Sequence, residues 1–96
     1  MDYEWDPTKA EYNLKKHKIN FDDATSVFDD PDCATLNVTK PEHGELRFSA
    51  IGIMHNGLMS AVIYTDRGNK RRIISARNVR KNEQREYDNR KASTQR

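Results

Sequence analysis

The sequence predicts a single α+β domain in which two N-terminal helices, a four-stranded antiparallel sheet and a C-terminal helix follow one another along the chain. Two observations carry this prediction. Helix-capping residues occur within residues 6–30, and from Ala34 onward apolar and polar residues alternate with the period of two that strands require. With 96 residues the chain can bury one small core. We therefore expect one domain over residues 1–91 and a flexible tail over residues 92–96.

The helices are predicted from their ends. Asp6 is suited to cap a first helix and Pro7 to occupy its first turn, and we expect this helix to end near His17. Asn20 is suited to cap a second, short helix, which Pro31 must end because proline lacks the backbone N–H that a helix needs. A charged third helix is predicted over about residues 79–91.

The strands are predicted from alternation and turn residues, at about residues 34–39, 45–55, 58–66 and 70–77. Asn56-Gly57 is a strong signal for a two-residue hairpin loop, because such a loop requires positive φ angles, and Gly68-Asn69 is a second such signal. If both loops contain two residues, residue 55 faces residue 58 and residue 67 faces residue 70.

This register assigns each residue of the sheet to one of two faces. The face expected to receive the N-terminal helices carries Phe48, Ala50, Gly52, Ala61, Ile63, Ile74 and Ala76. The opposite, polar face carries Glu45, Arg47, Ser49, Tyr64, Asp66, Arg71, Ser75 and Arg77. On this register Arg47 and Arg77 lie about 20 Å apart, which predicts contacts with successive phosphates of one strand and not a clamp on a single phosphate.

Charge is unevenly distributed along the chain. Residues 1–47 contain 6 Lys and Arg against 11 Asp and Glu, whereas residues 66–96 contain 11 against 4. A basic C-terminal third predicts an acidic partner, either nucleic acid or protein, although a solvated helix face is an equal alternative. No apolar run is long enough to cross a membrane, and the acidic start is unlike a signal peptide, so we expect a cytoplasmic protein.

The polar face suggests phosphodiester chemistry. Cleavage of RNA without a metal needs a base, an acid and cations, and arginine can supply only the cations. Glu45 and Tyr64 are the proton-transfer candidates, with His43 the better placed histidine. The alternative is a set of cross-strand salt bridges around Asp66, each contributing about 0 to 1 kcal/mol. Cys33 has no partner cysteine and the histidines lack zinc spacing, so we expect neither metal nor cofactor.

The last helix offers two interpretations. Glu83 and Tyr87 are four residues apart and therefore share a helix face. Either Tyr87 packs on the sheet while Glu83 faces an arginine, or Glu83 orients Arg77 for function. Arg80 and Lys81 form either a solvated face or a patch that attracts RNA.

Several segments together resemble a known family. WDPTKAEYNLKKHKINFDDATSVFDDP, HGELRFSAIG and YTDRGNKRRIISAR, followed by the Glu83-to-Tyr87 spacing, are similar to the BrnT toxins of type II toxin-antitoxin systems over about residues 4–87. The resemblance implies a RelE-like fold, RNA cleavage that halts translation, and a small DNA-binding antitoxin whose complex represses its own operon. One departure is Leu58, where many members carry an arginine after the turn glycine.

We therefore expect a metal-independent endoribonuclease toxin with a ribbon-helix-helix antitoxin. The resemblance implies site roles for the residues that match the family motifs, which are Glu45, Arg47, Arg67, Arg77, Glu83 and Tyr87. The predicted register, however, places Arg67 on the helix-facing side. The expected catalytic residues are Glu45, Arg47, Tyr64, Arg67 and Arg77, the expected RNA contacts are Arg71, Arg80 and Lys81, and the expected supporting residues are Glu83 and Tyr87. The alternative function is a non-catalytic module that binds RNA or protein through the C-terminal basic patch.

Overall fold

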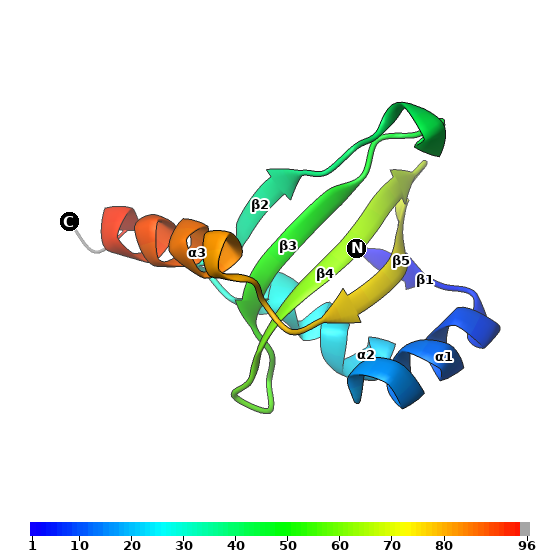
Figure 1. Cartoon of the computed structure of the whole chain (residues 1–96), viewed down its shortest axis with the longest axis horizontal. Coiled ribbons are helices and arrows are strands. Elements are labelled where there is room, and N and C mark those ends of the chain that lie inside the picture. Colours follow the sequence, from blue (N-terminus) through cyan, green and yellow to red (C-terminus); the bar gives the residue numbers. More distant parts are fainter. Residues whose placement is uncertain (95–96) are drawn as a thin grey trace.

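The computed structural model describes residues 1–94 and consists of three α-helices, two 3₁₀ helices and a five-stranded sheet. The elements are β1 (Asp2–Glu4), α1 (Pro7–His17), α2 (Phe21–Ala24), η1 (Thr25–Asp29), β2 (Ala34–Asn37), η2 (Pro41–His43), β3 (Phe48–Ile53), β4 (Met59–Arg67), β5 (Lys70–Arg77) and α3 (Lys81–Thr94). The strand order is β1-β5-β4-β3-β2 (Figure 1). The predicted α+β class and the four antiparallel strands are confirmed.

One strand was not predicted. β1 lies parallel to β5, with Tyr3 opposite Arg71, so the sheet is mixed and not purely antiparallel. β1 has only three residues and no alternating pattern, so its sequence does not indicate a strand. It forms a strand because β5 supplies its hydrogen-bond partners. α3 extends to Thr94, beyond the predicted end near residue 91, and residues 95–96 of the predicted tail lie outside the described residues.

The N-terminal helices begin where the sequence predicts. Asp6 accepts a hydrogen bond from the Thr8 backbone N–H at 2.8 Å, and Asn20 accepts one from the Asp23 backbone N–H at 2.7 Å. Buried Asn13 fastens α1 to the sheet, because its side chain donates to the carbonyl of Ala76 at 2.9 Å and accepts from the N–H of the same residue at 3.0 Å. These contacts hold α1 against β5.

Helices cover the two faces of the sheet unequally. α1, α2 and η1 lie on one side, called here the core face, where the buried cluster is Ile19, Phe21, Ala24, Val27, Ala50, Met54, Val62, Tyr64, Ile73 and Ala76. α3 lies on the other side over β2 and β3, with a smaller cluster of Ile51, Ala61 and Tyr87 (Figure 1). We call this second side, which α3 leaves bare over β4 and β5, the open face. No helix of the described chain is long and apolar enough to cross a membrane.

The first hairpin differs from the prediction by one residue. Its loop is His55-Asn56-Gly57, since Ile53 faces Met59 and the Met54 N–H donates to the Leu58 carbonyl at 2.8 Å. Gly57 has a φ of 87°, the left-handed conformation that such a three-residue loop requires. The shift reverses the faces of β4, because adjacent residues of a strand point to opposite sides. Ala61 and Ile63 therefore lie on the open face and not in the predicted core.

The second hairpin begins in the predicted register but does not keep it. Arg67 faces Lys70 as predicted, but a bulge between Ile63 and Tyr64 leaves Ile74 without a partner, with Tyr64 opposite Ile73 and Ile63 opposite Ser75. A bulge inserts one residue and so changes which residues share a face. The predicted core positions of Ala50 and Ala76 are confirmed, whereas that of Ile74 is wrong.

Candidate active site

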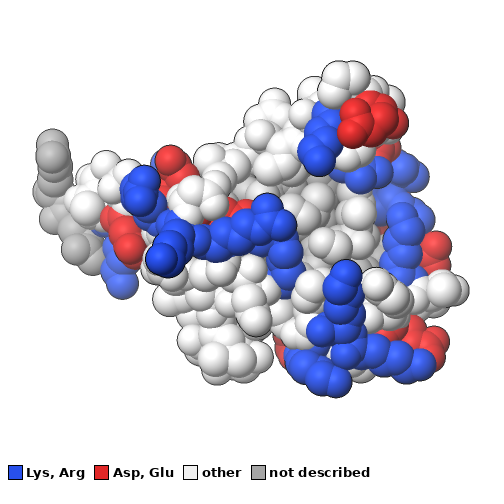
Figure 2. Space-filling view, viewed as in Figure 1, with Lys and Arg blue, Asp and Glu red and all other residues white. Residues whose placement is uncertain are grey.

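Basic side chains surround the open face. In Figure 2, Lys and Arg gather over α3 and along the opposite margin of the molecule, with largely uncharged surface between them. On this face the register places Arg47, Ser49, Ile63, Thr65, Arg67, Arg72, Ser75 and Arg77. A chain of phosphates crossing the sheet would meet cations at both ends of this surface.

Glu45 joins two of these arginines at one end of the open face. Its Oε1 accepts a hydrogen bond from Nη2 of Arg67 at 3.0 Å, and its Oε2 accepts one from Nε of Arg47 at 3.3 Å. The hydrogen bond from Arg67, supported by that from Arg47, holds the pKa of Glu45 below its ordinary value. A carboxylate is thus kept ionised between two guanidinium groups. The prediction that Arg67 lies on the helix-facing side is wrong, because the loop shift turns β4 over.

A second arginine-carboxylate pair lies at the other end of the open face. Both Nη atoms of Arg77 donate to Glu83, at 2.8 and 2.9 Å, and the Ser49 hydroxyl donates to the same carboxylate at 3.4 Å. Glu83 also accepts from the Arg80 backbone N–H at 2.8 Å, so it satisfies a donor that the start of α3 leaves unpaired. Both interpretations of Glu83 are geometrically possible, since it faces an arginine and fixes that arginine in place.

The ionisation of Glu83 depends on these bonds. Only 3% of the residue is exposed, and burial by itself would raise the pKa of its carboxyl group. The hydrogen bonds from Arg77 and from the Arg80 N–H outweigh burial, so the pKa lies below its ordinary value. The carboxylate is therefore buried and ionised, and it binds Arg77, the Arg80 N–H and the Ser49 hydroxyl together.

Tyr64 and Arg71 do not belong to this face. Tyr64 is 6% exposed and packs edge-on to Phe28, with ring centroids 5.2 Å apart. The guanidinium of Arg71 lies over both rings, 4.4 Å from the Tyr64 centroid and 4.7 Å from that of Phe28. The predicted pair of Arg71 with Asp66 is present at 2.8 Å. The prediction that Tyr64 and Arg71 share a face with Arg47 is wrong, because the shift of the first loop turns them to the core face.

The remaining predicted residues lie around α3. Arg80 and Lys81 are exposed where α3 begins, and Tyr87 is buried against the sheet. The hydroxyl of Tyr87 donates to Asp30 at 2.7 Å, and the Ile53 N–H donates to the same oxygen at 2.8 Å. Tyr87 thus fastens α3 to β3 and to the end of η1.

The corrected register brings the two ends of the open face closer together. Arg77 faces Ala61, and Arg47, the residue before Phe48, lies opposite Thr65. These two positions of β4 are four residues apart, or roughly 13 Å at about 3.3 Å per residue, in place of the predicted 20 Å. The shift of the first loop also places Arg72 on the open face, because it turns over β4 and the part of β5 that pairs with it before the bulge. The bulge lies beyond Arg72 and returns Ser75 and Arg77 to the open face, and no residue pattern marks it.

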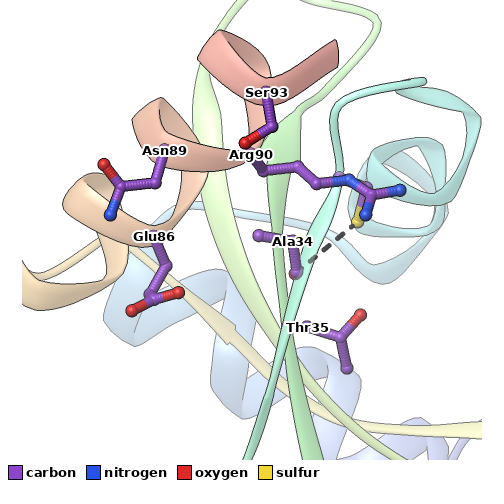
Figure 3. Close-up of a pocket in the computed structure, with 7 residues that line it drawn as sticks. Ala34, Thr35, Glu86, Asn89, Arg90 and Ser93 are labelled. Atoms are coloured by element: carbon purple, nitrogen blue, oxygen red, sulfur yellow. Dashed lines mark hydrogen bonds between the residues drawn. The ribbon is translucent and has the colours of Figure 1, made fainter.

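A separate hollow lies between β2 and α3. Its volume is about 410 Å³, and Figure 3 shows it lined by Ala34 and Thr35 on one side and by Glu86, Asn89, Arg90 and Ser93 on the other. Cys33 also lines it, and burial raises the pKa of this thiol to about 11. None of the predicted catalytic residues borders the hollow. Within residues 1–94, no group of three His, Cys, Asp or Glu side chains could hold a metal ion.

Comparison with known proteins first defines the class. The crystal structure of the Brucella abortus ribonuclease toxin, BrnT, superposes with a TM-score of 0.65 and 26% sequence identity, covering 84% of this chain and 99% of that chain. This similarity confirms the predicted RelE-like α+β fold. No curated protein sequence matches the chain.

The sequence then defines the family. Residues 5–83 match the family described as "Ribonuclease toxin, BrnT, of type II toxin-antitoxin system". The chain therefore belongs to the BrnT family of ribonuclease toxins, as its motifs predicted. Membership in such a family implies an RNA substrate and an antitoxin partner.

Proposed function

We propose that the chain is a metal-independent endoribonuclease that cleaves single-stranded RNA on the open face and thereby inhibits translation in the cytoplasm. Residues 1–91 would act as a single toxin domain. The observation that carries this proposal is the bridge from Arg47 through Glu45 to Arg67, because it sets a general base between two cations. Cations at a transferring phosphate can supply the charge stabilisation that a metal supplies elsewhere.

Substrate binding changes the partners within this cluster. A phosphodiester that binds Arg47 and Arg67 competes with Glu45 for their N–H donors, since arginine binds carboxylate and phosphate in the same geometry. Loss of those hydrogen bonds raises the pKa of Glu45 from its depressed value, which makes the freed carboxylate a stronger base. Glu45 is then released beside the phosphate that is to be attacked.

Cleavage follows as an internal transesterification. Glu45 takes the proton of the ribose 2′-OH, the 2′-oxygen attacks phosphorus, and the bond from phosphorus to the 5′-oxygen breaks. The products are a 2′,3′-cyclic phosphate and a 5′-hydroxyl. We assign the proton for the departing 5′-oxygen to His43, two residues before Glu45 in the chain. In the neutral ring Nδ1 accepts from the Lys40 N–H at 3.0 Å. To act as the acid, the ring takes up a proton, gives up this hydrogen bond, donates from Nε2 and returns to neutral imidazole.

The partner we propose is a ribbon-helix-helix antitoxin. Family membership supports an antitoxin, and we further propose that the complex represses its own operon by contacting DNA through the antitoxin. Co-expression with the adjacent reading frame would test this. A stable complex that binds its promoter is expected, and an antitoxin of another fold would contradict the assignment.

Incubation of the purified protein with single-stranded RNA in EDTA tests the ribonuclease proposal. We expect cleavage with 2′,3′-cyclic phosphate ends, and Glu45→Gln should retain RNA binding but cleave about 10² times more slowly or worse. Retention of RNA without cleavage by the unaltered chain would favour the alternative, a binding module that uses the basic patch. Cleavage that requires an added divalent ion would contradict metal independence.

A further inference from the structure

Arg72 lies on the open face although it belongs to none of the arginine-carboxylate pairs described above. Arg72 faces Thr65 across the ladder between β5 and β4, on the N-terminal side of the bulge. Its neighbour Arg71 points to the core face, where it lies over Phe28 and Tyr64. Two adjacent arginines of the same strand thus lie on opposite faces of the sheet.

Among the arginines of this face, Arg72 has the least committed hydrogen-bond donors. Arg77 uses both Nη atoms on Glu83, and Arg47 and Arg67 each donate to Glu45. The nearest carboxylate to Arg72 belongs to Glu4, whose Oε1 lies 3.8 Å from Nη1, too far for a hydrogen bond. The guanidinium therefore retains donors that a phosphate can use.

Thr65 lies between Arg72 and the cluster formed by Glu45, Arg47 and Arg67. Arg47, just before β3, and Arg72 on β5 lie on either side of Thr65 on the central strand, so their backbones are about 10 Å apart at about 4.8 Å per strand. Thr65 is buried, and its hydroxyl donates to the Leu46 carbonyl at 2.7 Å. The buried Thr65 thus fills the surface between Arg47 and Arg72. Arg67 lies two residues further along the same strand.

We propose that Arg72 binds a backbone phosphate of the RNA, as the third arginine of one site with Arg47 and Arg67. This inference rests on the proposed ribonuclease function and specifies which cations hold the substrate. Arg77, which donates from both Nη atoms to Glu83, serves instead to position α3 beside the site. The phosphate adjoining the scissile one would lie over the part of the sheet between β4 and β5.

The salt dependence of binding tests this assignment. The probe is a fluorescent 2′-O-methyl RNA oligonucleotide, which lacks the attacking 2′-hydroxyl, and its Kd is measured by anisotropy at several salt concentrations. Removal of one phosphate contact from a single strand lowers the slope of log affinity against log salt by about 0.7. We expect this decrease for Arg72→Gln, with recovery of the slope in Arg72→Lys, which restores the charge.

Two controls separate a lost contact from other effects. Lys15→Gln removes one charge from α1 on the core side, and Arg71→Gln removes one from the same strand on the core face, so both should keep the wild-type slope. Circular dichroism checks that each variant is folded. A wild-type slope for Arg72→Gln, together with a reduced slope for Arg67→Gln, would overturn this inference alone. A wild-type chain that neither binds the probe nor cleaves its 2′-hydroxyl counterpart would overturn the proposed function as well.

Discussion

Arg77 donates two hydrogen bonds to the buried carboxylate of Glu83, from Nη1 at 2.8 Å and Nη2 at 2.9 Å. The pair links the end of β5 to the first turn of α3. Arg77 cannot keep this bidentate contact and offer the same donors to a phosphate. Its arrangement is that of a residue that fixes the helix in place, and an alanine substitution therefore affects folding before it affects RNA binding.

Arg77→Ala should lower the free energy of unfolding by about 3 kcal/mol, because it leaves the Glu83 carboxylate buried without its cation. Urea unfolding followed by circular dichroism measures the change. The double variant Arg77→Met with Glu83→Gln removes both charges and should recover part of the loss. An Arg77→Ala protein as stable as the wild type would show that the pair does not support the fold.

Stability should fall in acid through the same carboxylate. The pKa of Glu83 is lower in the folded chain than its ordinary value of 4.5, so its contribution to stability is present above pH 4.5 and is lost as pH falls through the folded value. Urea unfolding of Glu83→Gln should show the largest deficit near pH 7 and a shrinking one as the pH is lowered below 4.5. A deficit that is constant with pH would contradict this linkage.

Tyr64→Phe should leave RNA cleavage nearly unchanged. The ring packs on the core face against Phe28 and below Arg71, on the side of the sheet opposite the Glu45 carboxylate. The rate per folded molecule is measured under single-turnover conditions, with Glu45→Gln as the inactive comparison. If Tyr64→Phe folded normally but lost as much activity as Glu45→Gln, the placement of the site on the open face would be wrong.

Tyr87→Phe should loosen α3. The change removes the hydrogen bond to Asp30, which still accepts from the backbone N–H groups of Ile53 and Asp32. We expect a loss of about 1.5 to 3 kcal/mol in the free energy of unfolding, typical of a hydrogen bond to a charged group. Tyr12→Phe on α1, where the tyrosine is exposed, is the matched control and should be neutral. Equal stability of the two variants would remove Tyr87 as the anchor of α3.

The elements of the fold were predictable because their signals are local. Asp6 and Asn20 cap helices, and both glycine-containing turns occur where the sequence places them. β1 was not predictable, because a three-residue strand is formed by its contact with β5. Local residue types therefore predicted most of the architecture and the family.

The composition of the site was predictable only in part, because it depends on register. Asn56-Gly57 is compatible with a two-residue or a three-residue loop, and that choice alone decides whether Tyr64 or Arg67 lies beside Glu45. The same choice decides between Arg71 and Arg72, and the bulge next to Tyr64 then decides that Arg77 lies on the open face. Motif similarity grouped Arg67 with Glu45 in one expected site, whereas the register argument placed Arg67 on the other face; in the structure the two side chains are hydrogen-bonded.

The central claim is that RNA is cleaved on the open face by the cluster of Glu45, Arg47 and Arg67. The most direct measurement is the single-turnover rate of RNA cleavage in EDTA for Arg67→Gln and for Arg71→Gln, which remove the same charge from opposite faces. The account predicts a loss of about 10² to 10³ for Arg67→Gln and a nearly wild-type rate for folded Arg71→Gln. Equal losses in the two variants, or full activity of Arg67→Gln, would contradict it.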